Sequence, residues 1–304
     1  MGRMRSELQI RRVLFILLMG LALGCGSPAP ARDPQTNAAH ESSARADVEK
    51  LIQQSGADVS VAFRSLDGTR ELFIQADQQF EDAAAMKIPV MIELYAEAEA
   101  RELRWSDPLP VHTTFRSVVD GSMYALNPGG DRDVSKSVGK TMTLRQLCDA
   151  MISRNSDLAA NLLIEKLGID RIRQRIQALG AGGMDLAAGF GDSKASAQGL
   201  KNVTSARALL EVLLALAGNQ VVSADASEQM VGLIARSGLQ ADISGATPLQ
   251  RPAPRKSPGG DHHDATIIIG ARSFVLVTDV RGPADPRATA ALVSQIAHAL
   301  SAAM

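Results

Sequence analysis

The sequence predicts a mixed α/β (α+β) fold, with a mainly antiparallel sheet built from N- and C-terminal strands, flanked by helices, plus a helical subdomain. Two observations predict it. Strand patterns occur near the two ends of the chain, at 59–63 and 72–74 and again at 266–269 and 274–280, whereas apolar residues in the middle recur at helical spacing. An isolated hairpin is only marginally stable, so the terminal strands are expected to pair in one sheet. A ligand site is then expected between the sheet and the helical lobe.

The composition limits the class of function. A chain of 304 residues is long enough for one or two domains with a sizeable core, and 45% hydrophobic and 21% charged residues are ordinary for a globular protein. A net charge of −1 gives no electrostatic basis for binding nucleic acid or an anionic membrane surface. An aromatic content of 3% argues against a platform for stacking bases or sugars.

Residues 1–24 have the pattern of an export signal. Four arginines precede an apolar run at 13–23, which is too short to span a bilayer comfortably and is followed by Gly24-Cys25. A small residue before cysteine is typical of a bacterial lipoprotein signal, in which Cys25 becomes the lipidated N-terminus. The alternative is an ordinary cleaved signal with a chance cysteine. We expect a membrane-anchored lipoprotein that faces the periplasm or the cell surface.

The segment 25–43 is rich in Ser, Pro, Ala and Asp, which predicts a flexible tether before a folded domain at 44–304. The first helix is expected at 44–54, where Val48, Leu51 and Ile52 share a face. The strands at 59–63 and 72–74 flank Asp67-Gly68, a hairpin signal. A helix from 86 to about 103 has Pro89 in its first turn, where proline is tolerated.

The middle of the chain is nearly all helical. Capping residues such as Thr143 at the start and Gly168 and Gly180 at the ends help to define the helices. Helices are predicted at 143–152, 158–166, 170–179, 205–216 and 226–236. The two C-terminal strands follow, and a last helix is expected at 286–303.

Several segments carry a resemblance to a known family. They are 84–94, which begins Ala84-Ala85-Met86-Lys87; 115–122, which begins Phe115-Arg116-Ser117; 155–163, which begins Asn155-Ser156-Asp157; 199–206, which begins Gly199-Leu200-Lys201-Asn202; and His263-Asp264-Ala265. In this order they resemble motifs of the class A β-lactamases and their penicillin-recognising relatives, over about 44–303. The resemblance implies a β-lactamase/transpeptidase-like serine hydrolase fold, with β-lactam hydrolysis as the family activity and no cofactor.

The resemblance places the attacking serine at position 84 and a lysine that helps remove its proton at position 87. This chain has Ala84, whose methyl group cannot attack a carbonyl. Lys87 is then either a relic base or a lysine satisfied by helix-end carbonyls and nearby side-chain oxygens. The second interpretation is favoured, because there is no hydroxyl at position 84 to deprotonate.

The resemblance also implies a Ser-Asp-Asn triplet, whose serine relays a proton to the leaving nitrogen. In the register set by the helix that follows, the triplet reads Asn155-Ser156-Asp157. A register shifted by one residue would begin it at Ser156, but needs a deletion in a tight turn. Cys148 supports the first register, since some members carry a disulfide cysteine there; the partner position is Met91, so that bridge is missing. Cys148 is expected to be a small buried hydrophobe.

Two further motifs depart from the family pattern. The implied water-activating glutamate falls on Gly191, with the shorter Asp192 next to it. The implied Lys-Thr-Gly of an edge strand reads Lys256-Ser257-Pro258, in which Lys256 can still attract a carboxylate, while the proline predicts a short or irregular strand. Loss of the nucleophile alone typically lowers the rate by about 10⁶-fold.

We therefore expect a degenerate member of the family, a pseudoenzyme of the cell envelope that binds a β-lactam, a peptidoglycan fragment or an envelope protein without turnover. One alternative is an active hydrolase with a displaced nucleophile, Ser156 or Ser122. Another is a purely structural envelope protein with a closed cleft. No metal site is expected at Asp261-His262-His263-Asp264, because adjacent residues of a strand point to opposite faces.

Overall fold

The computed structural model describes residues 34–82, 84–127, 131–236, 240–242, 255–256, 262–268, 273–282 and 285–302. The predicted signal at 1–24, Cys25 and Ser257 lie outside the described residues. In the part of the chain that is described, no helix is both long enough and apolar enough to cross a membrane.

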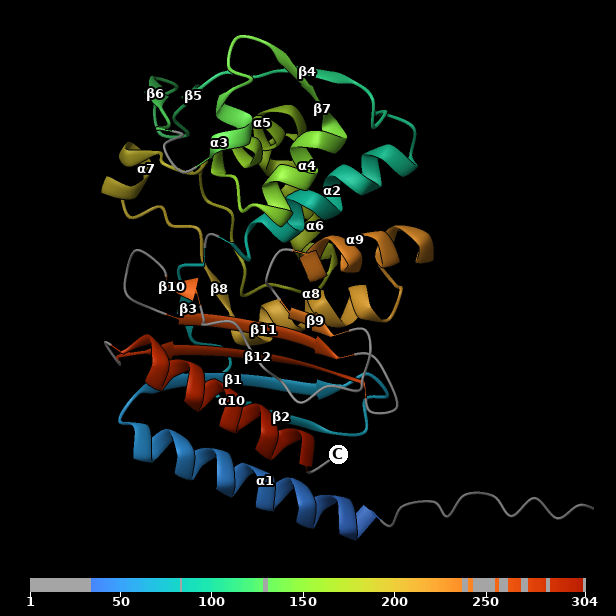
Figure 1. Ribbon diagram of the computed structural model, residues 1–304, viewed down its shortest axis with the longest axis vertical. Helices are drawn as coiled ribbons and strands as arrows, with labels where there is room; N and C mark the ends of the chain where they lie inside the picture. Colours follow the sequence, from blue (N-terminus) through green and yellow to red (C-terminus); the bar gives the residue numbers. More distant parts are fainter. Residues whose placement is uncertain are drawn as a thin grey trace, which may run out of the picture.

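A six-stranded sheet joins the two ends of the chain (Figure 1). Its strands are β1 (Asp58–Ser65), β2 (Glu71–Ile74), β9 (Gln240–Asp242), β10 (Arg255–Lys256), β11 (His262–Ile268) and β12 (Phe274–Arg281). The order β10-β11-β12-β1-β2 is antiparallel, and β9 pairs with β11 in parallel. β1 and β12 pair from Asp58↔Arg281 to Ser65↔Phe274, which confirms that the terminal strands share one sheet.

Helices cover both faces of the sheet. α1 (Pro34–Ser55) and α10 (Pro286–Ala302) lie on one face, and α8 (Ala206–Ala217) lies on the other (Figure 1). The helical lobe stands beyond α8. Its members are α2 (Lys87–Glu99), α3 (Arg132–Ser135), α4 (Leu144–Ser153), α5 (Asp157–Leu167), α6 (Ile169–Ala178), α7 (Ser193–Ala197) and α9 (Ala224–Arg236).

Two hydrophobic cores form because β12 is buried on both faces. Alternate side chains of a strand point to opposite faces. Phe274 and Leu276 pack in the core under α1 and α10, where the rings of Phe63 and Phe274 are 5.3 Å apart. Val275 and Val277 belong instead to the larger core, which continues into the helical lobe. The apolar run of β12 thus ties both helical layers to one sheet.

Local signals explain several helix ends. The Thr143 hydroxyl accepts a hydrogen bond from the backbone N–H of Gln146 at 3.2 Å, and the Gln146 side chain accepts one from the Thr143 backbone N–H at 2.9 Å. This reciprocal cap begins α4 at the predicted place. Ser205 caps α8 by a single hydrogen bond, which its hydroxyl accepts from the N–H of Ala208 at 3.2 Å.

The structure differs from the sequence prediction at several points. The helix predicted from 86 to about 103 ends at Glu99, and the short elements α3, α7 and β9 were not predicted. α1 begins at Pro34, within the segment 25–43 that the composition assigned to the tether; proline is accommodated at a first helical position, and the residues that follow include several alanines. Three small ladders were also not predicted, because strands of two or three residues carry no periodic signal. They pair β3 (Gln79–Phe80) with β8 (Thr204–Ser205), β4 (Pro108–Pro110) with β7 (Thr141–Thr143), and β5 (Thr114–Arg116) with β6 (Met123–Ala125).

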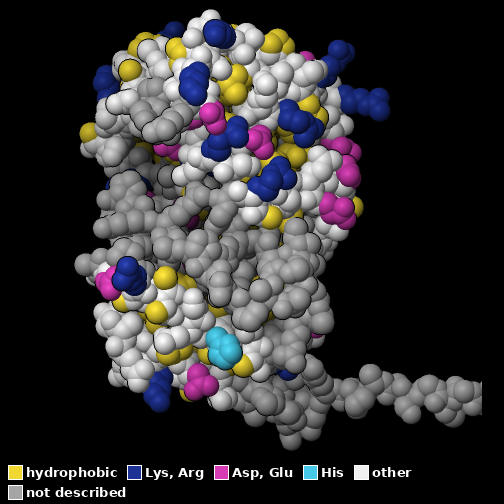
Figure 2. Space-filling view, in the orientation of Figure 1, with side chains coloured by type: hydrophobic (Ala, Val, Ile, Leu, Met, Phe, Trp, Pro, Cys, Tyr) yellow, Lys and Arg dark blue, Asp and Glu magenta, His cyan; other side chains and the backbone are white. Residues whose placement is uncertain are grey.

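The charged side chains are mixed in sign. Figure 2 shows Lys and Arg interspersed with Asp and Glu over the visible face of the helical lobe. Many of them pair, such as Arg154 with Asp133 at 3.2 Å and Arg173 with Asp185 at 3.1 Å. This face therefore carries no broad field of one sign, in keeping with the net charge of −1.

Candidate functional site

The turn before α2 positions Ala84 and Lys87. The Asp82 carboxylate accepts hydrogen bonds from the backbone N–H groups of Ala84 and Ala85 at 2.9 and 3.0 Å. The Lys87 N–H then donates to the Ala84 carbonyl at 3.2 Å, which starts the helix. Ala84 is half-buried. Its methyl group therefore occupies the start of α2, one turn before Lys87, where the resemblance places the attacking hydroxyl.

The Lys87 side chain is buried and donates to three oxygens. Its Nζ lies 2.8 Å from the backbone oxygen of Asn155, 2.7 Å from Asn155 Oδ1 and 2.6 Å from Asp157 Oδ1. The exposed fraction of the Lys87 side chain is 1%, against 49% for Asp157. A buried ammonium is stable only when it is paired and hydrogen-bonded, and these contacts meet that need. They also join the start of α2 to the turn between α4 and α5.

The turn between α4 and α5 adopts an unusual backbone. Asn155 has φ +57°, in the left-handed region that asparagine tolerates better than most residues. Ser156 follows as the N-cap of α5: its hydroxyl accepts from the Ala159 N–H at 2.9 Å and donates to Asp131. Asn155 and Asp157 therefore contact Lys87, whereas the described hydrogen bonds of the Ser156 hydroxyl go to Asp131 and Ala159.

Asn161 fixes the loop that carries Gly191. Its side-chain nitrogen donates to the Phe190 carbonyl at 2.8 Å, and its side-chain oxygen accepts from the Phe190 N–H at 2.7 Å. The Phe190 ring centre then lies 5.1 Å from Lys87 Nζ, a cation–π contact. Sequence reasoning identified Gly191 and missed Phe190, because the pairing with Asn161 is a long-range contact. The available signal was a large aromatic residue beside Gly191 in a chain with few aromatics.

The neighbours of Phe190 in the loop have structural roles. Gly191 has φ +76°, and an added Cβ would meet Leu126 Cδ1 at 2.7 Å, so this position suits glycine. The Asp192 carboxylate is buried and caps α7 by accepting from the Ala195 N–H at 3.1 Å. It also accepts from the Ser117 hydroxyl at 3.0 Å and from the Val118 N–H at 3.1 Å. Asp192 therefore holds the loop together.

Comparison with known proteins gives the same architecture. A family model described as the β-lactamase enzyme family matches residues 43–304. The chain belongs to this family. The chain is 29% identical to β-lactamase ROB-1 of Haemophilus influenzae over 150 residues, which are 49% of this chain and 45% of ROB-1. It thus spans less than half the length of that curated relative.

Two solved structures show the same fold. A β-lactamase from Chitinophaga pinensis superposes with a TM-score of 0.67 at 16% identity, over 86% of this chain and 99% of that one. A mutant of PBP-A, solved as an acyl-enzyme complex with penicillin G, superposes with a TM-score of 0.66 at 17% identity, over 86% of this chain and 96% of that one. At these identities the likeness establishes the fold of this β-lactamase-family chain.

The structure describes only part of Lys256-Ser257-Pro258, the segment that matches the family's Lys-Thr-Gly motif. Lys256 lies in β10, opposite His262 of β11, and the structure describes its backbone placement. Ser257 lies outside the described residues. The structure brings together Ala84, Lys87, Asn155, Asp157 and Phe190. Among the described residues, no group of three or more His, Cys, Asp or Glu is arranged to hold a metal.

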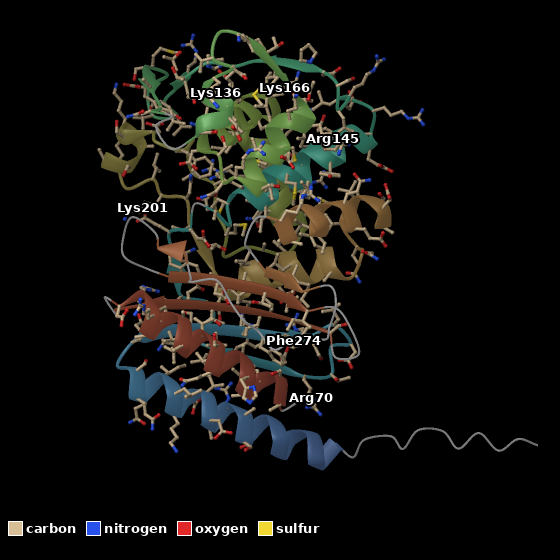
Figure 3. All side chains as sticks on the ribbon, viewed as in Figure 1. Arg70, Lys136, Arg145, Lys166, Lys201 and Phe274 are labelled. Carbon is tan, nitrogen blue, oxygen red and sulfur yellow. The ribbon has the colours of Figure 1, made fainter. Side chains whose placement is uncertain are left out.

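A cavity lies against the loop of Phe190. Its volume is about 370 Å³, and its lining includes Phe190, Asp192, Ser196, Lys201 and Asn202. Figure 3 labels Lys201, which forms an ion pair with Glu81 at 2.6 Å. Phe190 both lines this cavity and contacts Lys87, while Ala84, Lys87, Asn155 and Asp157 are not among its described lining residues. The size of the cavity is in the range of small-ligand sites.

The second candidate nucleophile, Ser122, lies on an exposed surface. Its hydroxyl donates to Asp120 at 2.6 Å and accepts from the Lys194 ammonium at 2.7 Å. The hydrogen bond from Lys194 holds the pKa of the Asp120 carboxyl far below its usual range. A carboxylate that binds protons more weakly is a weaker general base.

The contact between Lys87 and Asp157 leads to a stability prediction. Asp157→Asn is expected to lower the free energy of unfolding by about 1–3 kcal/mol, because the buried ammonium loses a carboxylate partner. Urea denaturation followed by circular dichroism measures the change.

Asp170→Asn is the matched control. Asp170 also lies in the first turn of a helix, but it is 87% exposed and its ion pair with Arg173 is long, at 3.9 Å. This substitution should change the stability by no more than about 0.5 kcal/mol. Equal losses for the two variants would mean that Asp157 does not stabilise Lys87.

Proposed function

We propose that this chain is a non-catalytic member of the β-lactamase family, which binds a ligand without forming an acyl-enzyme. The observation that carries the proposal is Ala84 at the start of α2, one turn before Lys87. An acyl-enzyme is an ester between the substrate carbonyl carbon and a side-chain oxygen. A methyl group supplies no such oxygen, so the first covalent step has no nucleophile at this position.

The state of Lys87 supports the proposal. A general base needs a free lone pair on its nitrogen. A lysine ammonium has three donors and no acceptor, and Lys87 Nζ directs hydrogen bonds to three oxygens of Asn155 and Asp157 at 2.6–2.8 Å. This geometry favours the charged form, in which Lys87 is a structural cross-link.

The loop that carries Phe190 and Gly191 also supports the proposal, because hydrolysis of an acyl-enzyme needs a base that activates water. The side chain that faces Lys87 from the loop is the Phe190 ring, at 5.1 Å. A phenyl ring cannot take a proton from water, whereas a carboxylate can. Asp192, the nearest acid along the loop, is committed to capping α7 and to Ser117.

The same geometry argues against the alternative that Ser156 or Ser122 acts as a displaced nucleophile. The Ser156 hydroxyl is buried, caps α5 and donates to Asp131. Moving it toward a substrate would uncap the helix. The Ser122 hydroxyl is bound between Asp120 and Lys194 on an exposed surface. Neither serine has a described contact with Lys87.

The candidate ligands are a β-lactam, which is the family's substrate class, and the peptidoglycan fragment that a β-lactam resembles. An envelope protein is the alternative. The cavity of about 370 Å³ beside Phe190 offers space for the first two. The PBP-A relative, which was solved with penicillin G, shows that the fold can hold a penicillin.

The proposal predicts binding without covalent change. The purified chain is incubated with fluorescent penicillin, analysed by intact mass, and assayed with nitrocefin. We expect an unchanged mass, no hydrolysis above buffer for the wild type or Ser156→Ala, and a raised melting temperature with penicillin G or a peptidoglycan fragment. A ligand at about 100 times its dissociation constant stabilises a protein by about 2.7 kcal/mol, which is readily measured.

Each arm of this experiment has a contradicting outcome. A covalent adduct, or nitrocefin turnover that Ser156→Ala abolishes, would establish the displaced nucleophile. The absence of a thermal shift with either ligand would contradict small-ligand binding and favour a protein partner or a purely structural envelope protein. An active class A β-lactamase run in parallel confirms that the reagents are competent.

We also propose that the chain is an exported lipoprotein, on the basis of the arginines, the apolar run at 13–23 and Gly24-Cys25. In cells labelled with a palmitate analogue, the wild-type chain should carry the label and remain in the membrane fraction, while Cys25→Ser should lose both properties. Cys148→Ser is the matched control and should keep the label. A wild-type chain without label would support the ordinary cleaved signal.

A further inference from the structure

A second cavity lies between three helices of the lobe, away from the family site. Its volume is about 240 Å³, and α2, α4 and α9 each contribute to its wall. The lining residues are Tyr95, Trp105, Arg145, Cys148, Asp149, Gln229, Gly232, Leu233 and Arg236. Tyr95 lies about 12 Å along α2 from Lys87, at a rise of about 1.5 Å per residue. Figure 3 shows Arg145 and Lys201, from the two cavities, on opposite sides of the molecule.

A glycine keeps this cavity open. Gly232 lies inside α9, where glycine is less favourable than alanine because it loses more backbone freedom on folding. A Cβ built on Gly232 would meet no atom within 4 Å, so its missing side chain leaves empty space in the wall. Larger side chains at this position would fill the cavity.

The wall of the cavity combines aromatic rings with a cation. The Tyr95 and Trp105 rings meet edge to face, with centres 4.6 Å apart. The Arg145 guanidinium lies 4.1 Å from the centre of the Trp105 ring, a cation–π contact. Burial raises the pKa of Tyr95 to about 12, and its hydroxyl accepts a hydrogen bond from Arg145. The Leu233 and Cys148 side chains add apolar surface.

The charge of the lining favours an anion. Arg145 and Arg236 contribute two positive charges, and Asp149 contributes one negative charge. That carboxylate is already shared between Arg154 at 3.3 Å and Arg236 at 3.7 Å. Within the described part of the chain, no carboxylate lies within ion-pair distance of Arg145, so a ligand carboxylate would meet a guanidinium without such a competitor.

We propose that this cavity binds a small carboxylate that carries a flat ring. The carboxylate would pair with the planar guanidinium of Arg145, which matches it in geometry. The ring would lie against Trp105 and Leu233, where aromatic and apolar surface is available. The volume is slightly below the range of about 300–1,000 Å³ typical of drug-sized ligands, which favours a single ring. The site uses neither Ala84 nor Lys87, so it stands independently of the proposed function.

Trp105 reports binding directly, because it is the single tryptophan of the chain. We expect titration of the full chain with benzoate to change its fluorescence saturably. Benzamide keeps the ring but not the charge, and should bind at least about tenfold more weakly, a factor equivalent to about 1.4 kcal/mol. Acetate keeps the charge but not the ring and should also bind more weakly. No saturable change with benzoate, or equal affinity for benzamide, would overturn the proposal.

Two variants of one residue place the ligand in the cavity. Gly232→Leu fills the open space and should abolish the response to benzoate, whereas Gly232→Ala leaves most of the space and should retain it. Circular dichroism spectra and melting temperatures are measured to check that both variants fold. Unchanged benzoate affinity in a folded Gly232→Leu variant would place the ligand elsewhere and refute the assignment. As a second readout, Arg145→Gln should lower the affinity at least about tenfold.

Discussion

The hydrogen bonds of the Lys87 ammonium connect α2 to the turn between α4 and α5 inside the helical lobe. The side chain is 1% exposed, and burying its charge would be unfavourable without hydrogen-bonding partners. Three oxygens, two from Asn155 and one from Asp157, surround the nitrogen at 2.6–2.8 Å. Because Asn155 adopts a left-handed backbone, both its carbonyl and its side chain can reach the same nitrogen. The start of α2 and the turn between α4 and α5 are therefore one unit, and Phe190 covers the lysine from the loop.

This arrangement gives one physical account of several sequence changes. A lysine beside a serine must be able to exchange a proton, whereas a lysine beside Ala84 has no such requirement. Asn155 and Asp157 supply two side-chain acceptors to Lys87, which suits a permanent ammonium and stabilises the turn. Ser156 is buried as the cap of α5. On our proposal, the family fold is retained, and these residues cross-link α2 to the turn between α4 and α5 instead of taking part in catalysis.

Much of the fold could be predicted from the sequence because its signals are local. The apolar spacing identified most of the helices, Thr143 marked the start of one of them, and the terminal strands needed each other to be stable. Features that depend on long-range contacts were not predicted. The approach of Phe190 to Lys87 requires Asn161 to fix the loop, and no local pattern in the sequence contains that contact. The cavity at Gly232 likewise exists only once three helices have packed.

The central claim is that the buried Lys87 ammonium and the half-exposed Asp157 carboxylate act together as an ion pair, and a double-mutant cycle measures this directly. The free energies of unfolding of the wild type, Lys87→Met, Asp157→Asn and the double variant are compared under the same conditions. Our account predicts that the two losses are coupled by about 1–3 kcal/mol, because the second substitution removes little once the pair is broken. Losses that add to within about 0.5 kcal/mol would show that the two residues act independently and would contradict the account.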